Sequence, residues 1–123
     1  MTRFTESHEW IQMKGNVGTV GITDYAQKEL GEIVYIELPK IGQKVKAGQE
    51  ICVLESTKAA ADVYAPVSGK IVALNEALRE NPSAINKKAE SAAWLFQIEL
   101  ANVKELDHLV NREQYNALYF GGE

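Results

Sequence analysis

The sequence predicts a mainly β fold in which two small antiparallel sheets face each other as a sandwich or flattened barrel. Apolar residues alternate with other residues over short runs, which is the period of a strand with one buried face. Gly and Pro residues bound these runs and supply the turns. Helical spacing is confined to a short stretch near 24–30 and to the C-terminal region. Many short strands with few helices are typical of a sandwich or barrel.

Two runs show the strand period most clearly. One face of the first run, which ends before Pro39, holds Val34, Ile36 and Leu38. In the second run one face holds Trp94, Phe96, Ile98 and Leu100, and the opposite face holds Leu95, Gln97 and Glu99. We expect further strands at 17–22, 51–56, 61–65 and 70–74.

The first helix is expected at 24–30, with Asp24 as its N-cap, Gln27 three residues later and Gly31 at the C′ position. Near the C-terminus, Val103, Leu106 and Val110 recur at helical spacing. Asn111 and Gln114 are suited to begin a last helix that packs on the sheets through Tyr115, Leu118 and Tyr119. Residues 79–93 show neither period, so they are interpreted as a long surface loop.

Length, net charge and the single cysteine limit the classes of protein to which the chain can belong. A chain of 123 residues that is 46% hydrophobic is expected to form one domain over 1–123. A net charge of −4 argues against a nucleic-acid partner, and no apolar run approaches the ~20 residues of a membrane-spanning helix. Cys52 lies in an apolar run and suits a buried thiol in a reducing compartment. With no secretory or transit segment, we expect bacterial cytoplasm, or mitochondrial matrix after removal of a transit peptide.

The segment from Ile51 to Pro66 reads as strand, tight tip and strand. Apolar residues enter and leave the tip, and Thr57-Lys58 stands where a hairpin must reverse. Lys58 is therefore expected to project into solvent. An exposed lysine at a loop tip is ordinarily a solubilising charge, so the residue alone does not identify a site.

The surrounding residues resemble the lipoyl-bearing family, and within it the glycine cleavage H proteins. The hairpin residues that match are Glu55-Ser56-Thr57-Lys58-Ala59 and Ala65-Pro66-Val67-Ser68-Gly69. Further matches along the chain are Ser7-His8-Glu9-Trp10, Gly21-Ile22-Thr23-Asp24, Ala26-Gln27, Leu30-Gly31-Glu32-Ile33-Val34 and Glu37-Leu38-Pro39. The resemblance covers nearly the whole chain and implies a barrel-sandwich hybrid with Lys58 at a hairpin tip.

The resemblance implies that lipoate is attached to Lys58 through an amide, on a protein without a catalytic centre of its own. Glu55, Ser56 and Ala59 are then the residues that a lipoate ligase or lipoyl transferase reads around the target amine. For Glu55 a solubilising charge at a strand end remains the alternative, and small residues after Lys58 also simply suit a tight hairpin.

The family's cycle implies three partner enzymes. Glycine decarboxylase, which uses pyridoxal phosphate, loads an aminomethyl group onto the arm, and a tetrahydrofolate-dependent aminomethyltransferase removes it. Dihydrolipoamide dehydrogenase, an FAD enzyme, then reoxidises the arm. The loaded arm folds into a cleft on the carrier, whose polar lining maps by motif onto Ser7, Glu9 and Asp62. Two carboxylates suit a cationic amine in a partly dry cleft.

One segment departs from the family pattern. Ala89-Glu90-Ser91-Ala92-Ala93-Trp94 replaces the Gly-rich approach to the late tryptophan. Losing those glycines restricts the backbone, so docking to one partner is expected to differ. His8 and His108 receive no catalytic role.

Three alternatives remain. The same hairpin serves a lipoyl relay to 2-oxo acid dehydrogenases or an incomplete glycine cleavage pathway. A biotin carrier would have Met on both sides of the lysine, where this chain has Thr57 and Ala59. A stand-alone enzyme or an unmodified interaction protein is the third, although no catalytic triad, phosphate loop or metal-spaced cluster is visible in the sequence.

Overall fold

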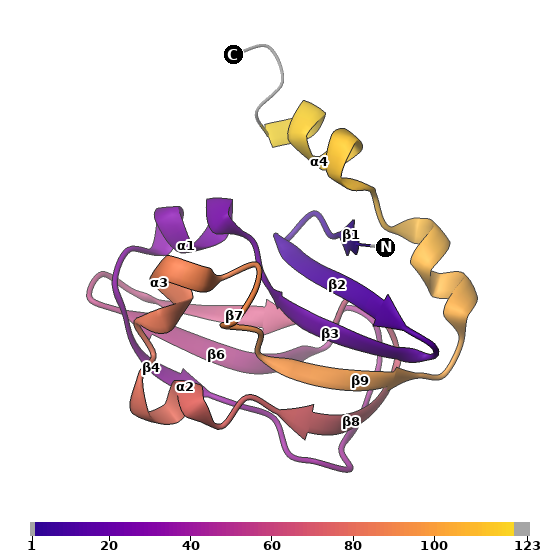
Figure 1. Cartoon of the computed structure of the whole chain (residues 1–123), viewed down its shortest axis with the longest axis horizontal. Coiled ribbons are helices and arrows are strands. Elements are labelled where there is room, and N and C mark those ends of the chain that lie inside the picture. The colour runs from indigo at the N-terminus through magenta and orange to yellow at the C-terminus, as the bar shows by residue number, and fades with distance from the viewer. Residues whose placement is uncertain (1, 120–123) are drawn as a thin grey trace.

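The computed structural model describes residues 2–119, which form two antiparallel sheets flanked by short helices (Figure 1). The larger sheet has the order β1 (Thr2–Phe4), β2 (Glu9–Lys14), β3 (Val17–Ile22), β9 (Phe96–Leu100), β8 (Gly69–Leu74) and β5 (Lys44–Val45). The smaller sheet has the order β4 (Ile33–Glu37), β6 (Glu50–Ser56) and β7 (Ala60–Tyr64). The helices are α1 (Asp24–Leu30), α2 (Ala77–Glu80), α3 (Ala84–Lys88), the 3₁₀ helix η1 (Val103–His108) and α4 (Arg112–Tyr119). This architecture confirms the predicted mainly β class with two facing sheets.

The two sheets share one apolar core. Ile11 and Ile98 of the larger sheet and Leu54 of the smaller sheet have no exposed surface, and all belong to the same buried cluster. A second, smaller cluster joins Phe4, Trp10 and Tyr115 beneath α4. The Phe4 and Tyr115 rings stack at 4.8 Å between centroids, and Tyr119 packs against the same cluster, so the predicted packing of the last helix against a sheet is confirmed for these two tyrosines. The expected packing of Leu118 was wrong, because its side chain is 63% exposed.

Two details of the predicted alternation were wrong. In β4 the register shifts between Ile33 and Tyr35, so Ile33 and Ile36 point into the core while Val34 is half exposed. A bulge inserts one residue and reverses the faces that follow it. Leu95, assigned to the face opposite Phe96 with Gln97 and Glu99, is fully buried in the main core cluster. It precedes β9, and its N–H donates to the Val20 carbonyl at 2.7 Å.

Strands β1, β2 and β5 were not among the predicted strands. In β2, Glu9, Trp10 and Ile11 are buried in succession, so both faces are covered and the polar–apolar alternation disappears. The two-residue strand β5 is too short to show a period at all.

The interpretation of 79–93 as one long surface loop was also wrong. The segment contains the end of α2 and all of α3, and it buries Ile85, Ala89 and Ala93. Helices of four and five residues are too short to repeat an apolar face, so their period is invisible. Asn81-Pro82 separates the two helices, because the residue before a proline avoids the helical region.

Helix α1 forms over the predicted residues with a different cap. The Thr23 hydroxyl accepts the Ala26 N–H at 3.2 Å, and Asp24 is the first helical residue. Gly31 ends the helix at φ 85°, as predicted for the C′ position.

At α4, Asn111 and Gln114 form a reciprocal pair. The Asn111 N–H donates to Gln114 Oε1 at 2.9 Å, and the Gln114 N–H donates to Asn111 Oδ1 at 2.8 Å. The helix proposed for Val103, Leu106 and Val110 is shorter than expected, since η1 ends at His108 and Val110 forms a bridge with Phe4. None of the helices within residues 2–119 is long and apolar enough to cross a membrane.

Candidate functional site

The tip of the β6–β7 hairpin is held by one side chain. Ser56 Oγ accepts the N–H groups of Lys58 and Ala59, each at 3.1 Å, and its hydroxyl lies 3.1 Å from the Ala59 carbonyl. The Thr57 N–H donates to the Glu32 carbonyl at 3.0 Å, which ties the tip to the segment after α1. The backbone of the tip is therefore fixed, while the side chains of Glu55, Lys58 and Ala59 are exposed.

The Lys58 side chain runs past the end of α1. A Cβ atom built on Gly31 would lie 3.1 Å from Lys58 Cε, so a side chain at position 31 would crowd the lysine stem. Gly31 also has φ 85°, a conformation that favours glycine. The glycine thus ends the helix and leaves room for the lysine at the same point.

A cleft of about 310 Å³ lies beside the hairpin. Its walls come from the turn before β2, from α1 and from the hairpin strands β6 and β7. The lining residues are Ser7, His8, Glu9, Ile22, Tyr25, Ala26, Glu29, Leu30, Leu54, Ala61, Asp62 and Val63. The three polar residues expected from the sequence, Ser7, Glu9 and Asp62, therefore line one cleft.

Glu9 is a buried carboxylate that accepts hydrogen bonds on both oxygens. It is 2% exposed, and its Oε1 accepts the hydroxyls of Thr5 at 2.6 Å and Ser7 at 2.5 Å. Its Oε2 accepts the Tyr64 N–H at 3.2 Å. Burial raises the pKa of Glu9 above its ordinary value, and the hydrogen bonds from Ser7, Thr5 and Tyr64 partly oppose that shift. A cation in the cleft would favour the ionised form of this carboxylate.

Asp62 occupies a different environment. It lies on β7, the edge strand of the smaller sheet, and its side chain is exposed. Of the two carboxylates expected from the sequence, Glu9 is therefore buried and Asp62 is exposed.

Helix α1 adds residues that the sequence analysis did not select. Tyr25, Glu29 and Leu30 line the cleft with Ala26, and Glu29 is a third carboxylate there. These residues recur at three- and four-residue spacing within α1, so they share one helix face. This spacing could have been seen in the sequence, but it shows only that the residues share a helix face and not that the face lines a cleft.

The two histidines line different cavities. His8 lines the cleft at φ 71°, whereas His108 lines a neighbouring cavity of about 320 Å³ that also touches Ser7 and Glu9. Burial lowers the pKa of His8, and the nearby Glu29 charge opposes that shift. Within residues 2–119 no group of three His, Cys, Asp or Glu side chains is placed to hold a metal ion.

The segment that departs from the family pattern contacts β2 and α1, two elements that also contribute residues to the cleft. The Ala89 carbonyl accepts the Trp10 indole N–H at 3.0 Å, and the Asp24 N–H donates to Glu90 Oε2 at 2.8 Å. From α3, Asn86 Nδ2 donates to the Gly31 carbonyl at 2.8 Å and to Gln27 Oε1 at 3.0 Å. Both ends of α1 are therefore anchored by the segment that was interpreted as a surface loop.

Comparison with known proteins identifies the family of the chain. The family model described as Glycine cleavage H-protein matches residues 2–120. Curated glycine cleavage system H proteins include one from Beijerinckia indica that is 52% identical over 94% of this chain and 93% of the relative. Another, from Thermotoga maritima, is 48% identical over the same shares of the two chains.

A crystal structure of a glycine cleavage system H protein from Mycobacterium marinum superposes with a TM-score of 0.87. It is 32% identical and the match covers 95% of this chain and 94% of that one. Fold, family model and relatives agree over nearly the full length, and the resemblance found in the sequence is confirmed. The chain belongs to the glycine cleavage H-protein family.

Proposed function

We propose that this chain is the lipoyl-bearing carrier of the glycine cleavage system and that Lys58 carries the lipoyl group. When attached, the group accepts an aminomethyl unit from glycine decarboxylase, passes it to aminomethyltransferase and carries electrons to dihydrolipoamide dehydrogenase. The observation that supports this function most directly is the exposed Lys58 on a fixed hairpin tip in a chain of this family.

The residues around Lys58 suit an amide-linked arm. The lysine amine is exposed, so a modifying enzyme can reach it. Amide formation removes the positive charge of the amine. Gly31 leaves space beside the stem, while the Ser56 hydroxyl fixes the backbone on both sides of the attachment point. A mobile arm is thus anchored on a rigid base.

The cleft suits the loaded end of the arm. Ala26, Leu30 and Leu54 provide apolar contact, and exclusion of water there limits hydrolysis of the cargo. A primary amine is cationic at neutral pH, and it would lie among the carboxylates of Glu9, Asp62 and Glu29. Ser7, Glu9 and Asp62 are therefore proposed as the polar lining that receives the cargo.

Recognition by a lipoate ligase or lipoyl transferase is proposed to involve Glu55, Ser56 and Ala59. Glu55 provides an exposed carboxylate three residues before the target, Ser56 sets the tip geometry, and Ala59 leaves the lysine unobstructed. The partners are the pyridoxal-phosphate decarboxylase, the tetrahydrofolate-dependent transferase and the FAD dehydrogenase. The chain itself is proposed to have no catalytic centre, and its proposed location is the bacterial cytoplasm.

The relay alternative uses the same tip but does not need loading of the cleft. Family membership favours glycine cleavage over a relay to 2-oxo acid dehydrogenases, and Thr57 and Ala59 do not favour biotin.

The deciding experiment combines the lipoylated chain with glycine and a pyridoxal-phosphate glycine decarboxylase, and follows intact mass and released carbon dioxide. We expect carbon dioxide release together with an aminomethyl-sized mass gain on the carrier, and neither with Lys58→Arg. A chain that is lipoylated but neither reduced nor loaded would contradict the glycine cleavage role and favour the relay.

A further inference from the structure

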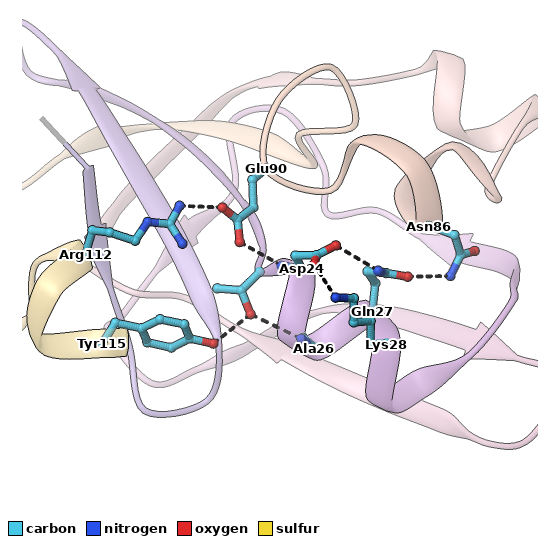
Figure 2. A network of polar contacts seen from close by, with 9 residues as sticks. Asp24, Ala26, Gln27, Lys28, Asn86, Glu90, Arg112 and Tyr115 are labelled. Carbon is cyan, nitrogen blue, oxygen red and sulfur yellow. Dashed lines mark hydrogen bonds and ion pairs between the residues drawn. The ribbon is translucent and has the colours of Figure 1, made fainter. Parts of the chain in front are cut away.

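The hydroxyl of Tyr115 joins two walls of the cleft from outside it. Tyr115 lies on α4 and is 1% exposed. Its hydroxyl is 2.8 Å from Thr23 Oγ1 and 2.7 Å from His8 Nδ1. Figure 2 draws two dashed lines, one from the Tyr115 hydroxyl and one from the Ala26 N–H, that meet at a side chain without a label; by the distances this is Thr23. Tyr115 itself does not line the cleft, so it acts only through the residues it contacts.

The contact between the Tyr115 hydroxyl and Thr23 supports the N-cap of α1. Thr23 Oγ1 accepts the Ala26 N–H at 3.2 Å while it is bonded to the Tyr115 hydroxyl. The helix that begins here presents Ala26, Glu29 and Leu30 to the cleft. A seven-residue helix depends strongly on its end contacts, because isolated helices of this length are unstable in water.

The contact between the Tyr115 hydroxyl and His8 supports a strained residue in the turn before β2. His8 has φ 71°, which is uncommon for a residue with a side chain, and it separates Ser7 from Glu9. The His8 carbonyl accepts the Thr23 N–H at 2.9 Å, so the turn and the helix cap are also joined through the backbone. Rings of Tyr25 and Tyr119 lie 4.6 and 4.5 Å from the His8 ring. The Tyr115 hydroxyl therefore helps hold the turn that brings Ser7 Oγ to Glu9.

A second link between α4 and α1 runs through charged groups. Arg112 pairs with Glu90 Oε1, and Glu90 Oε2 accepts the Asp24 N–H at 2.8 Å (Figure 2). The Arg112 side chain is half exposed, so water and salt weaken this pair. The buried hydroxyl of Tyr115 is the less screened of the two links.

We propose that Tyr115 is a positioning residue for the arm cleft: its hydroxyl sets the α1 wall against the Ser7–Glu9 wall and so controls how well the loaded arm is protected. This inference rests on the proposed carrier function. It assigns to the C-terminal helix a role in retaining cargo, in addition to its packing on Phe4.

The first test uses the unmodified chain and needs no cofactor. Tyr115→Phe keeps the ring stacked on Phe4 and removes the hydroxyl. We expect amide hydrogen exchange at Ala26 to accelerate about fivefold, the size expected from the loss of one hydrogen bond. Tyr119→Phe is the matched control, because its hydroxyl donates to the Glu6 carbonyl at 3.1 Å and not to Thr23. Thr23→Ser keeps a hydroxyl at the cap and should exchange like the wild type.

The second test measures cargo retention on the full lipoylated chain. The arm is reduced with a phosphine and loaded with formaldehyde and ammonium, which forms one carbon–sulfur and one carbon–nitrogen bond and releases water. Hydrolysis reverses this reaction and returns the thiol, formaldehyde and ammonium, so intact mass follows it directly. Tyr115→Phe should lose its cargo about fivefold faster than the wild type. Tyr35→Phe, which removes a half-exposed hydroxyl on β4, should lose it at the wild-type rate.

The outcomes are separable. Equal rates of exchange and of cargo loss for Tyr115→Phe and the wild type would overturn the positioning role while leaving the carrier function intact. Equal acceleration of Ala26 exchange by Tyr115→Phe and Tyr119→Phe would attribute the effect to loss of any α4 hydroxyl and not to the Tyr115–Thr23 contact, and would also overturn the positioning role. If no variant and no wild-type chain gains a lipoyl group, the proposed function itself fails, and this inference fails with it.

Discussion

The hairpin tip and the buried Glu9 carboxylate with its donors, called the floor of the cleft below, differ in exposure and in the origin of their contacts, although both are proposed to serve the same arm. At the tip, Lys58 is exposed and its backbone is set by Ser56, two residues away. At the floor, Glu9 is buried and its donors come from the preceding turn and from Tyr64, fifty-five residues later. Attachment requires access, whereas retention of a labile cargo requires exclusion of water. The tip is therefore a local structure and the cleft a tertiary one.

Truncation of Glu9 should lower the free energy of unfolding more than any other change considered, and much more than truncation of an exposed carboxylate on the hairpin. Glu9→Ala leaves the Thr5 and Ser7 hydroxyls and the Tyr64 N–H without their shared acceptor. We expect the free energy of unfolding in urea to fall by about 3 kcal/mol, since unsatisfied buried polar groups are costly. Glu55→Ala, at the exposed end of β6, is the control and should change it by less than about 0.5 kcal/mol. Similar losses for both variants would remove the distinction between tip and floor.

The pH dependence of stability tests the same carboxylate. Because burial raises the pKa of Glu9 above its ordinary value of 4.5, the folded state binds this proton more tightly than the unfolded state. The contribution of Glu9 to stability is therefore fully present below pH 4.5 and is lost as pH rises through the folded pKa. Glu9→Gln should lose less stability than the wild type over that window, as followed by thermal unfolding in a series of buffers. Parallel pH profiles would contradict a raised pKa.

Gly31 links the two regions, because it ends α1 beside the Lys58 stem. Gly31→Ala and Gly42→Ala both place a side chain at φ near 90° and should each cost about 1 kcal/mol. Only Gly31→Ala also crowds Lys58, since nothing lies within 4 Å of a Cβ at Gly42. The initial rate of lipoylation by a ligase, followed by intact mass, should fall for Gly31→Ala alone. Equal rates for the two variants would show that the space beside Lys58 does not matter.

The smallest change in stability is expected for a substitution at the hairpin tip. Ser56→Ala removes the acceptor of the Lys58 and Ala59 N–H groups, but both are exposed and can bond to water. We expect a loss of about 0.5 kcal/mol in stability and faster amide exchange confined to the tip. Exchange that spread into α1 or the β2 turn would mean that tip and cleft are not independent.

The difference between local and tertiary structure also explains how much could be predicted. The strand–tip–strand pattern around Lys58 lies in consecutive residues, so it was predicted from the sequence and the hairpin has that form. The Asn111–Gln114 capping pair was predicted for the same reason. The lining by Ser7, Glu9 and Asp62 was inferred through the family resemblance, since no local pattern connects these positions.

The features that were not predicted depend on contacts between segments that are distant in the sequence. Asn86 and Glu90 hold the two ends of α1 from a segment without visible periodicity, and Tyr115 reaches Thr23 across ninety-two residues. The succession of buried residues in β2 and the bulge in β4 similarly follow from packing on both faces and from register, which composition does not reveal. The expectation of a single domain and the altered docking near Trp94 stay predictions.

The carrier role depends most directly on attachment at Lys58. Wild type, Lys58→Arg and Lys70→Arg, which changes an exposed lysine on β8, should be expressed with lipoate and a competent ligase, and their intact masses compared. A lipoyl-sized gain is expected in wild type and Lys70→Arg and none in Lys58→Arg. A gain that persists in Lys58→Arg, or no gain in any of the three, would contradict the assignment of Lys58 as the attachment site.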